Sequence, residues 1–336
     1  MEMKSNFWGT FKKKYSIYLI LMALFVICSF ANENFLTVNN LTNISRQLAV
    51  TTILAFGETM LIISGMLDLS AGSVLALSGV LSVYAYKMGA PLIAAVLVGI
   101  VIGVLCNLIN VLMISTFKAP PFIATLAMMT MARGVALLIT KGQNILQLGN
   151  YVVLGQGSIG IIPIPVIFLA VIAVITWYIL NHTRFGRSLY AVGGNEEAAI
   201  ASGINVSKIK YIAFIINGIF VGLAGVLFMS RVNAGLPNGA INYEFTALTA
   251  AIIGGTSFSG GIGTAGGTLA GAFIVGFLDN IMNLTNVDSY VQQIIRGAII
   301  ALAVIYDIRS KNRTTRSMLG RIEDKQAETG KKAAKA

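Results

Sequence analysis

Long apolar runs alternate with short polar stretches along most of this chain. A helix needs about 20 apolar residues to cross the hydrocarbon core of a bilayer, and most of the runs approach that length. The runs at 71–86 and 245–258 are short, which predicts a broken or tilted helix in each. The pattern predicts an all-α, polytopic transmembrane helix bundle of about ten spans, at residues 15–30, 48–66, 71–86, 91–114, 119–140, 162–180, 211–230, 245–258, 262–279 and 289–307.

The basic residues indicate how these spans are oriented. With the N-terminus in the cytoplasm, the predicted cytoplasmic segments hold 18 Lys and Arg residues, whereas the external loops hold four. Cytoplasmic loops of membrane proteins carry such an excess, so both termini are predicted to be cytoplasmic. The chain then divides into a basic N-terminus (1–14), a membrane domain (15–308) whose longest cytoplasmic loop is 181–210, and a basic tail (309–336).

Composition excludes several function classes. Of the 336 residues, 56% are hydrophobic and 11% are charged, whereas soluble domains carry about 25% charged residues. Ten spans leave no room for a soluble catalytic domain. The net charge of +11 follows the membrane orientation and does not predict a nucleic-acid partner. Cys28, Cys106 and the single histidine, His182, lack the companions that a metal or catalytic site requires, so neither metal nor cofactor is expected.

The most informative polar stretch lies in the loop 181–210. Asn195 is a good N-cap residue, Glu196 and Glu197 suit the positive end of a helix dipole, and Gly203 is placed to end the helix. Such a short helix is unstable alone in water, so its own bundle or a partner must hold it. The small side chains of Ala198, Ala199 and Ala201 would let a partner approach closely, although an ordinary surface helix has the same features.

A specific resemblance rests on these residues. Glu197, Ala198 and Ala199 followed by Gly203 resemble the EAA---G signature of ABC importer permeases. The stretches 35–41, 68–73, 121–126 and 254–261 are similar to those of ribose, galactose and autoinducer-2 permeases, in the same order. The resemblance covers residues 15–310. It implies a permease subunit for a monosaccharide or similar polyhydroxylated solute, in the bacterial cell membrane.

The resemblance also implies partners. A separate ABC ATPase with two nucleotide-binding modules would dock on the short helix, at Gly194, Asn195, Glu196, Glu197, Ala198, Ala199 and Gly203. An extracytoplasmic binding protein would deliver the sugar, and a second permease copy, identical or not, would complete the pore. The chain has no G-x-x-x-x-G-K-[ST] motif, which a P-loop ATPase requires. Energy must therefore come from another subunit or from an ion gradient.

A path for neutral sugars needs hydrogen-bonding groups and aromatic faces rather than charge. The candidates for lining it are Asp68, Ser70, Ser73, Asn107, Asn110, Phe122 and Thr125. The chain departs from the family pattern at Met66, at Glu58, and at 244–246, where Glu-Phe-Thr replaces Glu-Leu-Asp. These departures make the transfer of a substrate from any one relative unsafe.

Charges inside spans cost free energy and therefore need explanation. Arg133 is expected to snorkel to the outer surface, and Arg296 is expected to pair with an acid. Asp68 could cap a helix that begins near Ser70 or lie beside the path, and Glu58 could face a water-filled path. The two acids motivate an alternative function, an ion-coupled secondary transporter; a third possibility is a membrane scaffold or receptor.

Glycine patterns complete the predictions. Gly261, Gly263 and Gly266 form a literal G-x-G-x-x-G, but no strand precedes it, so close helix packing is expected instead of dinucleotide binding. The pairs Gly99/Gly103 and Gly218/Gly222 are interpreted in the same way. The stretches 65–72 and 254–261 resemble each other weakly, which a chance similarity of Gly/Ser-rich segments explains as well as an internal repeat.

Overall fold

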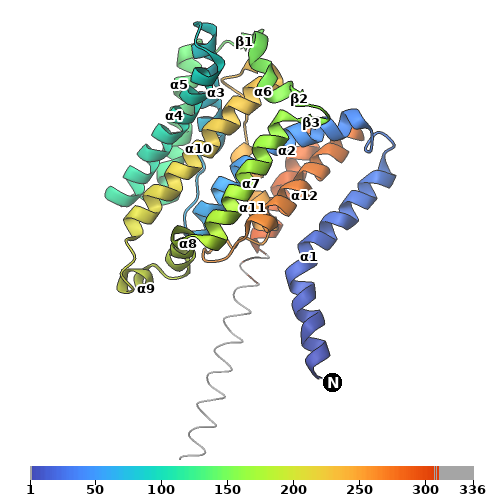
Figure 1. Ribbon diagram of the computed structural model, residues 1–336, viewed down its shortest axis with the longest axis vertical. Coiled ribbons are helices and arrows are strands. Elements are labelled where there is room, and N and C mark those ends of the chain that lie inside the picture. The colour runs from blue at the N-terminus through green and yellow to red at the C-terminus, as the bar shows by residue number, and fades with distance from the viewer. Residues whose placement is uncertain (1, 306, 308, 310–336) are drawn as a thin grey trace, which may run out of the picture.

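The computed structural model describes residues 2–305, 307 and 309, and it is a bundle of roughly aligned helices (Figure 1). The predicted tail 309–336 lies, except for Arg309, outside the described residues. The longer helices are α1 (Glu2–Ala31), α2 (Val38–Ile63), α3 (Ala71–Lys87), α4 (Leu92–Val111), α5 (Pro121–Thr140), α7 (Ile164–His182), α8 (Arg184–Gly194), α10 (Val206–Val232), α11 (Tyr243–Ile253) and α12 (Ala265–Leu284). A further apolar helix covers Ser289–Ile305.

Short elements connect these helices. A π-helical turn, η1 (Leu112–Thr116), extends α4, and a 3₁₀ turn, η2 (Gly149–Val152), leads into α6 (Val153–Gln156). Strand β1 (Ile145–Leu146) pairs antiparallel with β4 (Ala234–Gly235), and β2 (Ser158–Ile159) pairs with β3 (Ile162–Pro163). Helix α9 (Glu196–Ala201) follows α8. The strands lie at one end of the bundle, and α8, α9 and the N-terminus lie at the other (Figure 1).

The predicted membrane class agrees with the helices, whereas the span count is only partly supported. Six helices are long and apolar enough to cross a membrane: α2, α4 with η1, α5, α7, α10 and α12. Each of the other predicted runs also contains a helix, but Ser16–Ala31, α11 and Ser289–Ile305 are shorter apolar helices. The predicted ten spans and the cytoplasmic placement of both termini therefore stay predictions.

The core forms around α2 and α10, which are the most enclosed of the long apolar helices. Helix α10 packs against α2, α3 and α4. At the α4–α10 contact, a Cβ built on Gly222 would lie 2.6 Å from the carbonyl oxygen of Gly99, and one on Gly218 would lie 2.7 Å from that of Gly103. The predicted close packing at these glycines is confirmed. Small residues allow such backbone approach where lipid gives no hydrophobic driving force for association.

Two helices begin inside the bundle. Helix α2 ends at Ile63 beside α8, and the chain then returns through the largely buried segment 64–70 before α3 starts. From the opposite end, the chain leaves β4 and reaches the start of α11, where Glu244 is buried next to Gly72 of α3. The N-terminal ends of α3 and α11 therefore meet within the protein. Irregular backbone is tolerated at membrane depth only in such a protein-enclosed setting, and carboxylates are favoured near helix N-termini.

The weakly similar stretches 65–72 and 254–261 each follow the end of a helix. Gly65 (φ +78°) follows α2 and Gly255 (φ +87°) follows α11, each in a left-handed conformation. After each glycine the next residue donates its backbone N–H back into the helix, from Met66 to Leu61 and from Thr256 to Ala251. Both stretches therefore contain a helix C-terminal cap of the same kind. The aligned positions are Gly65 and Gly254, however, whereas the left-handed residues are Gly65 and Gly255, so the shared cap does not explain the sequence similarity.

Candidate functional site

Helix α9 has the start and the end that its sequence predicts. The side chain of Asn195 accepts a hydrogen bond from the backbone N–H of Ala198 at 2.9 Å, and Glu196 pairs with Lys210 of α10 at 3.0 Å. Gly203 lies just beyond the helix with φ +81°, a conformation that favours glycine. The predicted N-cap and terminator are confirmed, and the ion pair ties the helix to the bundle.

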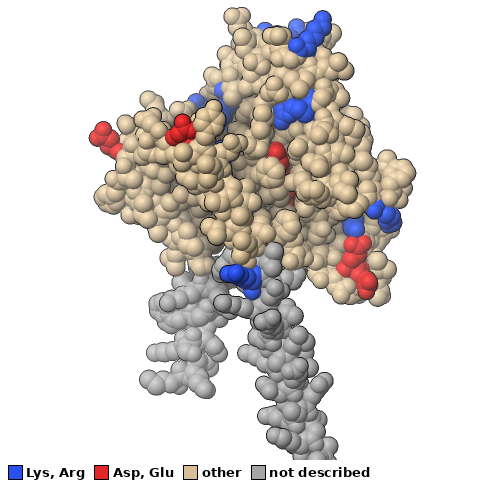
Figure 2. Space-filling view, turned by 180° about the vertical axis from the view of Figure 1, so that it is seen from behind, with Lys and Arg blue, Asp and Glu red and all other residues tan. Residues whose placement is uncertain are grey.

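Most of α9 faces outward. Gly194, Asn195, Glu196, Glu197, Ala198 and Gly203 are exposed, whereas Ala199 is buried against the rest of the protein. Ile200 is 58% exposed and is a large apolar side chain on this outward face. Seen from behind, α9 lies at a lower corner where acidic and basic side chains gather beside a largely uncharged face (Figure 2). The helix thus presents a mixed charged and apolar surface.

Helix α8, which precedes α9, is held firmly against the bundle. The Tyr190 hydroxyl donates a hydrogen bond to the carbonyl oxygen of Gly263 at 2.8 Å. Burial raises the pKa of Tyr190, so the hydroxyl keeps the proton that it donates. A Cβ on Gly193 would lie 2.8 Å from the backbone nitrogen of Gly261, which itself donates to the carbonyl oxygen of Ile63 at 2.8 Å. The end of α8 therefore contacts both the end of α2 and the loop before α12.

A cavity of about 770 Å³ opens beside this contact. Its walls combine four parts of the chain: the end of α2, the η1 turn with the loop that follows it, the α8–α9 junction, and the start of α10. Polar residues on the wall include Ser64, Ser115, Lys118, Asn195 and Lys210. The cavity links the α9 surface to the segment that leads from α2 toward α3.

A buried polar network lies where α3 begins. Asp68 Oδ1 accepts hydrogen bonds from the backbone N–H and the hydroxyl of Ser70, and Asp68 Oδ2 accepts one from Asn217 Nδ2 at 2.9 Å. Asn217 also donates to Asn107 at 2.9 Å, and Asn110 donates to the Ser70 hydroxyl at 2.9 Å. All five side chains are buried. Asp68 therefore holds Ser70, the N-cap residue of α3, and the network joins the start of α3 to α4 and α10.

The structure brings together four of the seven predicted path residues: Asp68, Ser70, Asn107 and Asn110. Ser73 is buried on α3, the Thr125 hydroxyl bonds to its own helix at the carbonyl oxygen of Pro121, and Phe122 is 56% exposed. None of the seven lines the 770 Å³ cavity, and their role in a path stays a prediction. The sequence analysis missed Asn217 and Tyr190. A lone Asn within the apolar run 211–230 was the available signal for Asn217.

The charged residues within the helices have different explanations. Arg296 pairs with Asp279 at 2.8 Å, as expected. Arg133, which was expected to snorkel outward, donates from Nη1 to the carbonyl oxygens of Pro237 at 2.6 Å and Gly239 at 2.8 Å in the segment before α11. Glu58 Oε2 accepts the backbone N–H of Asp68 at 3.3 Å, whereas Oε1 has no hydrogen-bond partner among the described residues.

These features define a multi-pass membrane transport subunit, with two helices that begin inside the bundle and a short exposed helix at one end. Residues 40–304 match the family model described as the permease component of branched-chain amino acid transport systems, and the chain belongs to this family. It is therefore a transport permease subunit and not an enzyme.

Curated relatives match nearly the whole chain. The chain is 38% identical over 309 residues to the ribose import permease protein of Haemophilus influenzae, covering 90% of this chain and 96% of the relative. It is 40% identical to the ribose import permease protein of Bacillus subtilis (91% and 96%). It is 36% identical to the D-allose transport system permease protein of Escherichia coli (91% and 95%). No solved structure matches the chain.

Proposed function

We propose that this chain is the membrane-spanning subunit of an ABC importer for a monosaccharide or similar polyhydroxylated solute. The observation that carries the proposal is the exposed, capped α9 helix, joined through α8 to the end of α2 and to the loop before α12. An ATPase with two nucleotide-binding modules would dock on α9, with Ile200 as its apolar anchor and Glu197 as a charged neighbour.

Mechanical coupling follows from these contacts. The backbones at Gly193, Gly261 and Ile63 are so close that α8 cannot shift without moving its neighbours. A displacement of α9 would therefore reach the segment 64–70 and the network around Asp68. Closure of the ATPase pair would change the opening of the bundle in this way.

The sugar assignment is supported by the relatives, whose names specify ribose and D-allose import. Both sugars are neutral, polyhydroxylated monosaccharides. In this proposal an external binding protein selects the solute before delivery. A second permease copy completes the pore in this proposal. The bacterial relatives support a location in the bacterial plasma membrane. The 18-to-4 distribution of basic residues supports the placement of both termini and α9 in the cytoplasm.

Copurification and ATP-driven uptake test the proposal. The substitution Ile200→Glu places a charge at the centre of the α9 surface, and we expect it to abolish both ATPase copurification and ATP-driven sugar uptake in proteoliposomes. Ile161→Glu is the matched control, because Ile161 is 96% exposed at the opposite end of the bundle; this variant should keep the ATPase bound. Wild-type protein that reproducibly purifies without an ATPase would contradict the proposal.

Ion-coupled secondary transport is the second candidate, favoured by the unpartnered Oε1 of the buried Glu58. It requires that the purified chain alone accumulates sugar under a proton or sodium gradient. We expect no such uptake. Gradient-driven accumulation that disappears in Glu58→Gln would establish the alternative.

A further inference from the structure

An open cavity of about 270 Å³ lies between α11, α12 and the helix Ser289–Ile305. Its lining mixes the aromatic ring of Phe245 with polar groups from all three helices. The polar residues are Asn242, Thr246, Thr249, Asp279, Gln293 and Arg296. None of the seven path residues predicted from the sequence belongs to it.

The ion pair in this cavity is incompletely bonded. Asp279 Oδ1 accepts the Nε–H of Arg296 at 2.8 Å, and Arg296 Nη2 lies 3.4 Å from Gln292 Oε1. Among the described residues, Asp279 Oδ2 accepts no hydrogen bond and Arg296 Nη1 donates none. The side chain of Arg296 is 40% exposed and that of Asp279 is 9% exposed. The pair therefore leaves the acceptor Oδ2 and the donor Nη1 unbonded among the described residues.

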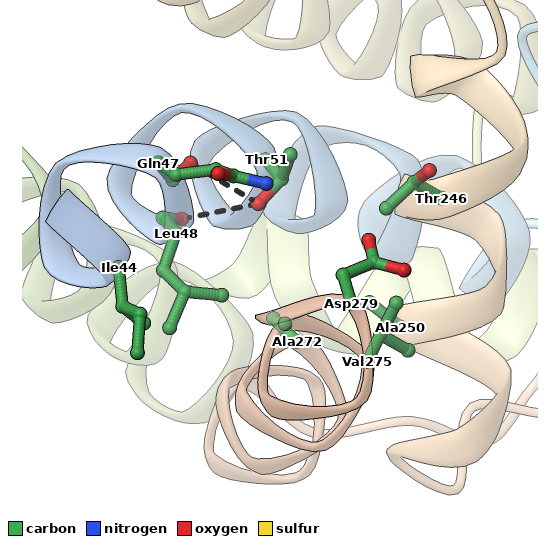
Figure 3. Close-up of a pocket in the computed structure, with 10 residues that line it drawn as sticks. Ile44, Gln47, Leu48, Thr51, Thr246, Ala250, Ala272, Val275 and Asp279 are labelled. Atoms are coloured by element: carbon green, nitrogen blue, oxygen red, sulfur yellow. Dashed lines mark hydrogen bonds between the residues drawn. The ribbon is translucent and has the colours of Figure 1, made fainter. Parts of the chain in front are cut away.

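Asp279 also lies at the inner edge of the cavity. A second, much smaller pocket of about 20 Å³ continues between α2, α11 and α12, and it shares Thr246, Val275 and Asp279 with the larger cavity. Figure 3 shows Thr246 and the Asp279 carboxyl group facing each other across this space, with Gln47 and Thr51 of α2 beyond them. The polar side chains of Asp279, Thr246, Thr51 and Gln47 thus extend from the open cavity toward α2.

Lipid is a poor occupant for such a surface. A charged side chain at the centre of a membrane span costs about 2.5–3.5 kcal/mol on insertion scales, so such residues line water-filled or protein-enclosed space. A polyhydroxylated solute fits the chemistry better. Carboxylate oxygens accept hydrogen bonds from hydroxyl groups, guanidinium groups donate to oxygen, and an aromatic ring can cover an apolar face of the solute.

We propose that this cavity is the solute-contacting part of the translocation path, in which Asp279, Arg296 and Thr246 bind the hydroxyl groups of the passing sugar. The inference rests on the proposed function and deepens it by naming the residues that contact the solute. Selectivity among sugars would then depend partly on Asp279.

The first test measures water access in the permease itself. Gln293→Cys replaces a lining residue, and Ile294→Cys replaces its neighbour, which is 72% exposed but does not line the cavity. A hydrophilic thiol reagent should label Cys at 293 and leave Cys at 294 largely unmodified, because thiols react as thiolates in water. The native Cys28 and Cys106 are buried, and the labelling of the protein without an added cysteine gives the background signal. Equal labelling of both positions, or labelling of 294 alone, would overturn the proposal.

The second test measures selectivity in the complete transporter with D-ribose and D-allose. Asp279→Asn removes the charge that strengthens the hydrogen bond, and the loss of about 1.5–3 kcal/mol predicts a fall in kcat/KM of roughly 10- to 100-fold, unequal for the two sugars. Thr246→Val should lower it less. Thr130→Val is the control, because that hydroxyl also bonds to its own helix backbone but lies on α5 outside the cavity.

The outcomes separate this inference from the proposed function. If the wild-type complex shows no ATP-driven uptake, the proposed function fails. If the wild type transports and Asp279→Asn is unchanged, the cavity inference alone is wrong. It is also wrong if Asp279→Asn slows both sugars by the same factor and lowers the melting temperature, because Asp279 would then act only as a structural partner of Arg296.

Discussion

At the scale of single residues, Asp68 and Glu58 show how differently two buried carboxylates can be held. The Asp68 carboxylate is surrounded by donors: the N–H and hydroxyl of Ser70, Asn217 Nδ2 and, at 3.4 Å, Asn110 Nδ2. Glu58 accepts a single bond, and its Oε1 has no partner among the described residues. Both oxygens of the Asp68 carboxylate therefore need to remain acceptors, whereas one oxygen of Glu58 can be replaced by an amide group without the loss of a hydrogen bond.

This difference predicts opposite outcomes for two similar substitutions. Asp68→Asn places an NH₂ donor against donors, and the lost and unsatisfied hydrogen bonds should destabilise the protein by about 1–3 kcal/mol. Glu58→Gln keeps an acceptor for the backbone of Asp68 and should change stability little. Thermal unfolding of both variants in detergent measures the difference. An equal loss in both variants would show that charge, rather than hydrogen-bond direction, determines their contribution.

The sequence predicted part of this residue-level arrangement. Asp68 was expected at the start of a helix near Ser70, and Asn195 and Gly203 were expected to bound a short helix, because caps are local features of a few neighbouring residues. Asn217 could not be assigned in this way. Its partners, Asp68 and Asn107, lie more than a hundred residues away in the chain, and a single polar residue in an apolar run does not reveal which helix it faces.

At the scale of elements, glycine contacts set the distance between α4 and α10. Gly218 and Gly222 face the carbonyl oxygens of Gly103 and Gly99, and Gly103 faces that of Gly218, so neither helix can gain a side chain at these positions without moving. Apolar runs predicted where helices occur, but they did not predict that α3 and α11 begin inside the bundle. Those positions depend on tertiary contacts, such as Gly72 with Glu244, which leave no periodic pattern in the sequence.

The α4–α10 contact predicts a steric loss at Gly218. Gly218→Ala would bring its new methyl group to 2.7 Å from the carbonyl oxygen of Gly103, and overpacking of this kind costs typically about 1–3 kcal/mol. Gly134→Ala is the matched control in α5, where nothing lies within 4 Å of the added methyl group; there the better helix propensity of Ala should leave stability equal or higher. Melting temperatures should fall for the first variant only. A comparable fall at Gly134 would attribute the effect to the loss of glycine flexibility.

At the scale of the whole molecule, orientation in the membrane is the property that every functional proposal needs. Described basic residues at the strand end include Arg46, Lys87 and Arg231; Arg46 donates to the carbonyl oxygen of Gln156, and Lys87 donates to that of Gln147. At the other end, Lys210 pairs with Glu196 beside α9. Two of the four basic residues expected outside, Arg46 and Lys87, thus bond to backbone carbonyl groups. The distribution of basic residues over all loops indicates the orientation more strongly than these individual contacts do, because an excess of Lys and Arg marks the cytoplasmic side.

Ten spans with cytoplasmic termini predict which loops a reagent outside the cell can reach. Single cysteines at Gly89, Ile161 and Asn286 lie in loops predicted to be external, and those at Lys118 and Ser202 lie in loops predicted to be cytoplasmic. A membrane-impermeant maleimide should label the first three in intact cells and the other two only after permeabilisation. Labelling at position 286 tests whether α11 and the helix Ser289–Ile305, which are shorter than a full span, cross the membrane as predicted. If the cysteine at 286 reacts from the same side as the cysteine at 202, an even number of membrane crossings separates the two positions. Helix α9 could still dock an ATPase in that case. The basic tail would then lie outside the cell, or the last helix would not cross the membrane.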